Sequence, residues 1–137
     1  MKRSGVAPTG AEYFCLLSSP SGTQGGPGVC GHRSNRLFPV TALGELEAGF
    51  QLGEGVRENR VALMAFLAEP FVSVAPTSVE VALRYGEICS QLRRAGTPIP
   101  TNDIWIAATT IDCGGQLLTF DQHFANVPGL RHTLIQI

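Results

Sequence analysis

The chain has 137 residues, a formal net charge of −1 at pH 7 and an apolar content of 44%. This length fits one domain, which would bury roughly two thirds of its unfolded surface and needs no disulfide or metal staple to fold. The basic side chains are nine arginines and one lysine, Lys2, so the chain lacks a polybasic tail and the composition of a strong nucleic-acid-binding protein.

The amino-terminal part of the chain is compositionally distinct. Seven of the first 31 residues are glycine, and no aspartate occurs before Asp103. Residues 13–17 are aromatic and apolar and are predicted to form a short buried strand, whereas residues 18–34 are rich in Ser, Gly and Pro and are predicted to form a loop. We therefore divide the single domain into an atypical segment, residues 1–36, and a regular remainder, residues 37–137.

Helices alternate with strands in this remainder. Leu43, Leu46 and Phe50 lie at helical spacing, with Thr41 as the expected N-cap and Gly53 as the expected stop. The further elements expected are a helix at 57–67, a strand at 71–74, a helix that starts in the capping sequence Thr77-Ser78-Val79-Glu80 and ends at Gly96, a helix capped by Thr101 at 101–113, and strands at 116–119 and 132–135. Because parallel strands need crossover connections, this order predicts an α/β fold with a mostly parallel sheet covered on both faces.

The cysteines and the apolar stretches indicate a cytoplasmic protein. Cys15, Cys30, Cys89 and Cys113 lack paired C-x-x-C spacing, and no long apolar stretch follows the first three residues as it would in a signal peptide. The longest strongly apolar stretches fall far short of the ~20 residues needed to cross a bilayer. The sequence therefore predicts a reduced, soluble protein.

Three acidic side chains lie near points where secondary structure changes. Asp103 opens a predicted helix, Asp121 follows a predicted strand, and Glu45 lies near the start of another helix. Such positions can meet beyond the carboxyl ends of parallel strands, where several oxygen ligands can hold Mg²⁺ or Mn²⁺ and leave room for water and a phosphate oxygen. Each acid alone also has a more common explanation: helix stabilisation for Asp103, a turn for Asp121 and an exposed helical position for Glu45.

The order of these motifs carries a resemblance. Thr101-Asn102-Asp103-Ile104-Trp105, then Thr119-Phe120-Asp121-Gln122-His123-Phe124, then Val127-Pro128-Gly129-Leu130 resemble the carboxy-terminal half of PIN-domain ribonucleases, with VapC-type toxins of type II toxin–antitoxin systems as the closest subgroup. Residues 41–49 resemble the family's central acidic helix. The resemblance covers about residues 37–135. It implies a three-layer α/β/α domain that cleaves RNA with Mg²⁺ or Mn²⁺, is inhibited by a small antitoxin protein and forms a homodimer.

The resemblance also implies roles for individual residues. Glu45, Asp103 and Asp121 would be the catalytic acids and the metal ligands. Asn102 and Thr119 can orient a carboxylate or a water molecule through hydrogen bonds, although a helix-start and a strand-end position explain them equally well.

Other side chains near these motifs have weaker claims on function. His123 can contact an RNA phosphate or assist proton transfer, but a lone histidine beside a turn is more often structural, so it is not included among the catalytic residues. Trp105 and Phe124 can stack on RNA bases, although their apolar neighbours favour packing in the core.

The chain departs from the family at its amino end. Family members begin with a strand that ends in an aspartate, a principal metal ligand, whereas Leu17 is followed here by Ser18. Glu12 is the only carboxylate before Glu45, and it precedes the predicted strand. Two functions therefore remain open: a metal-dependent endoribonuclease toxin, or a catalytically degenerate PIN-like module that binds an antitoxin or another copy of itself.

Overall fold

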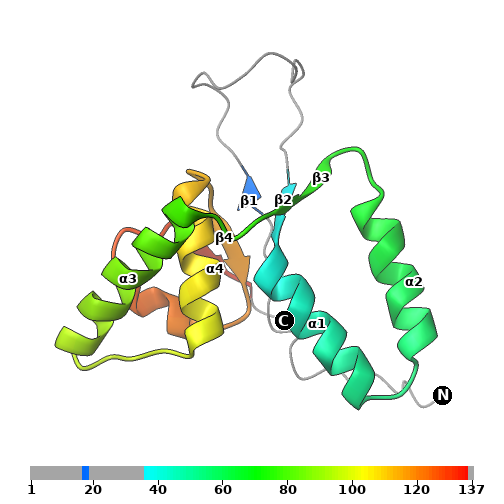
Figure 1. Cartoon of the computed structure of the whole chain (residues 1–137), viewed down its shortest axis with the longest axis horizontal. Coiled ribbons are helices and arrows are strands. Elements are labelled where there is room, and N and C mark those ends of the chain that lie inside the picture. The colour runs from blue at the N-terminus through cyan, green and yellow to red at the C-terminus, as the bar shows by residue number, and fades with distance from the viewer. Residues whose placement is uncertain (1–16, 19–35, 136–137) are drawn as a thin grey trace.

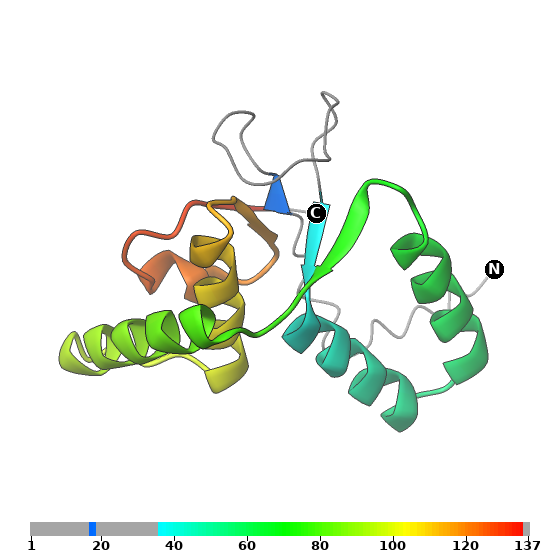
Figure 2. The ribbon, with the colours of Figure 1, turned by 45° about the horizontal axis from the view of Figure 1, so that its top comes forward.

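The computed structural model describes residues 17–18 and 36–135. The elements, in chain order, are β1 (Leu17–Ser18), β2 (Arg36–Pro39), α1 (Val40–Leu52), α2 (Val56–Leu67), β3 (Val72–Ala75), α3 (Val79–Arg94), α4 (Thr101–Asp112), β4 (Leu117–Thr119), the 3₁₀ helix η1 (Gln122–Asn126) and β5 (His132–Leu134). Figure 1 and Figure 2 both show the α1–α2 pair and the α3–α4 pair on opposite sides of β2 and β3. None of the described helices is long and apolar enough to span a membrane.

The strands confirm the predicted α/β class with mostly parallel pairing. β2 pairs in parallel with β3, so that Arg36 lies opposite Val72 and Pro39 opposite Ala75, and β4 pairs in parallel with β5. β1 pairs antiparallel with β2. The described strands form a three-stranded and a two-stranded sheet rather than the one continuous sheet expected, because β1 approaches β4 without joining its ladder. Apart from Leu17, the strand predicted at residues 13–17 lies outside the described residues.

Two of the expected helix caps are wrong because a proline precedes each helix. Thr41 lies inside α1, whose N-cap is Pro39, and Thr101 is the first residue of α4, whose N-cap is Pro100. Neither helix has a side-chain capping hydrogen bond at its N-cap, because proline has no side-chain acceptor. The restricted φ of proline suits the extended backbone that leads into each helix. The remaining bounds follow the predictions closely, whereas the short elements β2 and η1 were not predicted.

Charges and a cap at both ends stabilise α3. Its N-cap is Ser78, one position after the expected Thr77, and the Ser78 hydroxyl accepts a hydrogen bond from the Val81 N–H at 3.2 Å. Glu80 lies in the first turn and two arginines lie in the last turn, which complements the helix dipole. Gly96, with φ at +72°, follows the helix, and its conformation favours glycine.

The helix α4 is the centre of the core. Ile106, Ala107 and Ala108 have no exposed surface, and α4 packs against α3, α1 and η1. The buried hydroxyls of Thr109 and Thr110 each donate to the backbone carbonyl four residues earlier, at 2.8 Å. These bonds satisfy polar groups that would otherwise be costly to bury.

Two aromatic side chains considered for RNA stacking pack in the core or against it. Trp105 stacks on Tyr85 of α3, with ring centroids 4.1 Å apart and planes 24° from parallel. Phe124, in η1, has no exposed surface. Both observations confirm the core-packing interpretation, and Phe124 fixes η1 against the rest of the domain.

Two leucines on α3 provide a matched test of this packing. Leu92 is 1% exposed and Leu83 is 68% exposed. We expect Leu92→Ala to lower the free energy of unfolding by about 2–5 kcal/mol, because it leaves a cavity in the core, and Leu83→Ala to change it by about 0.5 kcal/mol or less. Urea unfolding followed by circular dichroism measures both. Equal losses of the free energy of unfolding in the two variants would show that the Leu92 side of α3 does not face the core.

Candidate metal centre

Asp103 lies in the first turn of α4, and the residue has no exposed surface. The backbone N–H groups of Asp103 and Ile104 both donate to the Pro100 carbonyl, at 3.1 and 3.2 Å, which fixes the start of the helix. The positive end of the helix dipole favours a carboxylate at this position. If a fully buried carboxylate is ionised, its loss of hydration costs several kcal/mol, and a nearby positive charge would offset this cost.

Two consecutive turns after β4 position Asp121. The hydroxyl oxygen of the buried Thr119 accepts a hydrogen bond from the Asp121 N–H at 3.1 Å. Asp121 is in turn the N-cap of η1, and its Oδ1 accepts a hydrogen bond from the His123 N–H at 2.8 Å. Thr119 therefore holds the backbone of Asp121 in place, and does not bond to its carboxylate.

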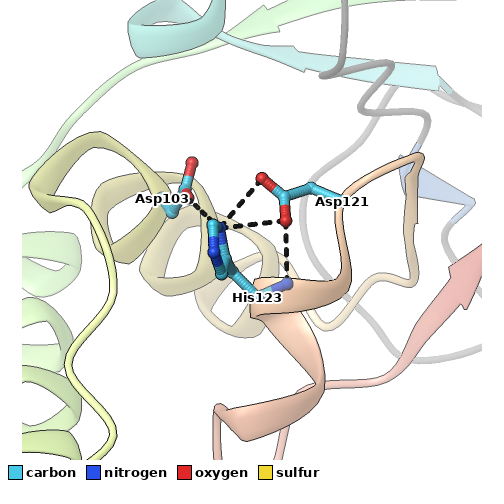
Figure 3. Close-up of side chains that lie close together, drawn as sticks. All are labelled: Asp103, Asp121 and His123. Atoms are coloured by element: carbon cyan, nitrogen blue, oxygen red, sulfur yellow. Dashed lines mark hydrogen bonds and ion pairs between the residues drawn. The ribbon is translucent and has the colours of Figure 1, made fainter.

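His123 brings a third group to the two aspartates. Its Nδ1 lies 3.0 Å from Oδ1 of Asp121 and 3.8 Å from Oδ2 of Asp103. Figure 3 shows the imidazole ring between the two carboxylates. One ligand atom from each of the three residues lies within 4.8 Å of the other two. We call Asp103, Asp121 and His123 the acid–histidine cluster.

His123 was not predicted to be a site residue, although a local motif indicates that its side chain lies near Asp121. In the motif Asp-x-His, the Asp121 carboxylate can accept a hydrogen bond from the His123 N–H. The resulting turn directs the histidine side chain back toward the acid. The half-exposed imidazole is therefore held at the site by local backbone geometry and not by burial in the core.

Glu45 is not one of the three members of the cluster, and it contacts Asn102, the residue before Asp103. The residue is partly buried, and burial raises the pKa of its carboxyl group, while a side-chain hydrogen bond from Asn102 partly opposes this rise. Within the described part of the chain, its buried Oε2 atom accepts no hydrogen bond. Asn102 thus connects Glu45 of α1 with the start of α4, next to Asp103.

These side chains fit a divalent cation. Carboxylate oxygens are the ligands that Mg²⁺ and Mn²⁺ prefer, and the cluster supplies them from Asp103 and Asp121, with Glu45 nearby. The buried charge of Asp103 and the buried oxygen of Glu45 would both be stabilised by a cation. The His123 side chain is 55% exposed, so one side of the cluster is open to solvent and to a substrate.

Comparisons with known proteins agree with this geometry. A model of the PIN domain matches residues 32–130. Ribonuclease VapC4 of Mycobacterium tuberculosis is 34% identical over 95 residues, which cover 67% of this chain and 71% of that protein.

Solved structures show the same fold. The crystal structure of VapBC2 from Rickettsia felis, bound to a DNA fragment from its promoter, matches with a TM-score of 0.66 and 26% identity over 72% of this chain and 73% of that chain. DNA-bound VapBC from Salmonella typhimurium matches with a TM-score of 0.65 and 24% identity over 71% of this chain and 73% of that chain.

The environment of Glu45 predicts an effect on stability that depends on pH. A carboxyl group whose pKa is raised by folding stabilises the folded state below its unfolded pKa of 4.5, and this contribution is lost as pH rises through the folded-state pKa. In buffer with a metal chelator at pH 7, we therefore expect Glu45→Gln to raise the melting temperature by about 1–3 °C, and to give no increase below about pH 4.

The matched control for this prediction is Glu47→Gln on the same helix. The Arg60 guanidinium lowers the pKa of Glu47, so this substitution should lower the melting temperature at pH 7, and the loss should shrink as pH falls below 4.5. Thermal unfolding followed by circular dichroism between pH 4 and pH 8 measures both variants. A lower melting temperature for Glu45→Gln at pH 7 would contradict the burial penalty described.

Proposed function

Because this chain belongs to the PIN-domain family, as a VapC-type member, we propose that it is a metal-dependent endoribonuclease toxin that hydrolyses phosphodiester bonds in RNA. The observation that carries the proposal is the convergence of Asp103 and Asp121, 18 positions apart in the sequence, at one partly open cluster. A buried carboxylate beside a second carboxylate is costly unless a cation joins them. The cation that fits this donor set is Mg²⁺ or Mn²⁺.

The proposed roles of the residues follow from their positions. Asp103 and Asp121 would hold the ion, and Glu45 would contribute a third carboxylate from α1. When bound, the ion would polarise a phosphate oxygen and lower the pKa of a water molecule. Asn102 would keep the Glu45 carboxylate directed toward the start of α4. Thr119 would keep Asp121 at the end of β4 through its backbone hydrogen bond.

Asparagine substitutions on one helix test this proposal. We expect Asp103→Asn to reduce Mn²⁺-dependent cleavage of a panel of RNA oligonucleotides by about 100-fold or more, because it removes a charged ligand without changing the side-chain shape. Asp112→Asn is the matched control. Asp112 pairs with Arg84 at 3.0 Å, and losing this partly exposed pair should cost about 1 kcal/mol or less and leave cleavage intact. Equal cleavage by both variants would exclude Asp103 from the reaction.

A second candidate function rests on the amino end of the domain. Ser18 is the last residue of β1, which runs antiparallel to β2, and the family resemblance implies a metal-binding aspartate at the end of the first strand. A catalytically degenerate module that binds an antitoxin or another copy of itself is consistent with this difference. If the folded wild-type chain cleaves no RNA with either Mg²⁺ or Mn²⁺, this second function replaces the first.

We also propose a small antitoxin protein as the partner, acting in the cytoplasm, and a homodimer as the form of the free chain. Val56, Arg57, Arg60, Val61 and Met64 line a depression on α2, where Arg60 also pairs with Glu47 of α1. Val61 is 64% exposed and Met64 is 55% exposed, beside the cationic side chains. This surface suits a partner segment that carries apolar and acidic side chains.

The α2 surface is tested by placing a charge on it. We expect Val61→Asp to abolish or strongly reduce co-purification of an antitoxin protein co-expressed with this chain, because a carboxylate would replace an apolar contact and repel acidic side chains. The matched control is Val79→Asp at the start of α3, where the parent valine is 74% exposed. RNA cleavage by the isolated chain should be unchanged in both variants. Undiminished binding by Val61→Asp would place the partner elsewhere.

A further inference from the structure

The imidazole of His123 occupies the space between the two aspartates, as Figure 3 shows. Its Nδ1 lies 3.0 Å and 3.2 Å from the two carboxylate oxygens of Asp121, and 3.8 Å from Oδ2 of Asp103. The ring therefore directs one nitrogen toward both acids. This position differs from that of a histidine on a solvated face, whose ring would contact water and not two carboxylates.

The backbone fixes this placement. The Asp121 carboxylate accepts the His123 N–H at 2.8 Å, which sets the direction in which the histidine side chain leaves η1. The next residue, Phe124, has no exposed surface and anchors η1 in the core. The His123 side chain is 55% exposed, so its ring is held by its contacts with the aspartates and not by packing on all sides. The ring can thus adjust its position by a rotation about its side-chain bonds while its attachment stays fixed.

We propose that Nδ1 of His123 is a direct ligand of the cation that Asp103 and Asp121 hold, and that this nitrogen shifts the preference of the site from Mg²⁺ toward Mn²⁺ and Co²⁺. This inference rests on the proposed function, because it concerns the same cation. Mg²⁺ takes oxygen ligands almost exclusively, whereas imidazole nitrogen binds first-row transition ions well. A site with two carboxylates and one imidazole therefore prefers Mn²⁺ and Co²⁺ over Mg²⁺ more strongly than a site with only carboxylates would.

The distances within the cluster suit shared coordination. Two neighbouring ligands of an octahedral ion lie roughly 3 Å apart when each is about 2.1 Å from the ion. The separation of 3.0 Å between Nδ1 and the Asp121 Oδ1 already has this value. The separation of 3.8 Å between Nδ1 and the Asp103 Oδ2 would need only a small rotation of the exposed ring.

The competing explanation is that His123 only donates a hydrogen bond that orients Asp121. In that arrangement the nitrogen would stay outside the coordination sphere, and its loss would weaken the binding of all divalent ions by similar factors. A ligand nitrogen would instead matter most for the transition ions. Comparing several ions therefore separates the two roles.

The experiment measures ion binding and ion–nitrogen contact in the purified full-length chain. Titration calorimetry gives the affinities for Mg²⁺, Mn²⁺ and Co²⁺, and pulsed electron paramagnetic resonance of bound Mn²⁺ detects coupling to a ligand ¹⁴N nucleus. His123→Gln removes the imidazole and keeps a polar side chain. The matched control is His132→Gln, which changes a partly buried histidine in β5 that is not a member of the cluster.

We expect a ¹⁴N signal in the wild type and in His132→Gln, and none in His123→Gln. His123→Gln should lose affinity for Mn²⁺ and Co²⁺ by about 10–100-fold while its affinity for Mg²⁺ changes by less than about threefold. A ¹⁴N signal that persists in His123→Gln would overturn the inference, as would equal losses for all three ions.

RNA cleavage measured in parallel separates this inference from the proposed function. If the wild type binds Mn²⁺ and cleaves RNA without a nitrogen signal, the ligand role of His123 is wrong and the nuclease function stands. If the nitrogen signal is present but no RNA is cleaved, the ligand role stands and the nuclease function is wrong. If the folded wild type binds none of the three ions, both are wrong.

Discussion

The buried carboxylate at the start of α4 is the constraint on which the arrangement of the site depends. Asp103 has no exposed surface, so its charge loses most of the hydration it would have in an unfolded chain. The helix dipole offsets part of this loss, and an imidazole lies 3.8 Å away. The second carboxylate, Asp121, adds negative charge at the same place. A cation shared by the two acids, as proposed above, would offset the cost of gathering their carboxylates at this place.

The helix that carries this carboxylate also carries much of the core. α4 packs against α3, α1 and η1, and Phe124 anchors η1. The separation between Asp103 and Asp121 is thus set by the packing of a largely buried helix against a 3₁₀ segment that Phe124 anchors. Ligands held in this way keep their geometry better than ligands on long surface loops. The price of this rigidity is that core substitutions near α4 will also displace the acids.

The sequence predicted the helices well and their first residues less well. Apolar periodicity indicated each helix, since α3 buries Val81, Ile88 and Leu92 along one face. The expected caps at Thr41 and Thr101 were wrong because prolines supply the extended backbone before both helices. β2 escaped prediction because it runs directly into α1 with no turn between them, and η1 because five residues are too few to establish a helical period.

The site was predictable where position along the chain decides it. A helix start and a strand end both face the carboxyl edge of a parallel sheet, so sequence order brought Asp103 and Asp121 to one place in the prediction. Whether Glu45 joins them depends on how closely α1 approaches α4, which is a matter of tertiary packing. The contact of His123 with the aspartates depends on a local turn that orients its side chain. The periodicity of apolar residues does not predict the orientation of a single side chain.

The position of Glu45 would link the proposed binding of a cation to the packing of α1 against α4. Burial makes ionisation of Glu45 unfavourable, and the Asn102 amide offsets only part of this cost. A cation beside Asp103 would favour the ionised form, because an opposite charge nearby lowers the pKa of a carboxyl group. Ionisation of Glu45 and occupation of the site would then support each other. A cation would thus offset the burial cost of the Glu45 carboxylate and favour the packing of α1 against α4 that brings it toward Asn102.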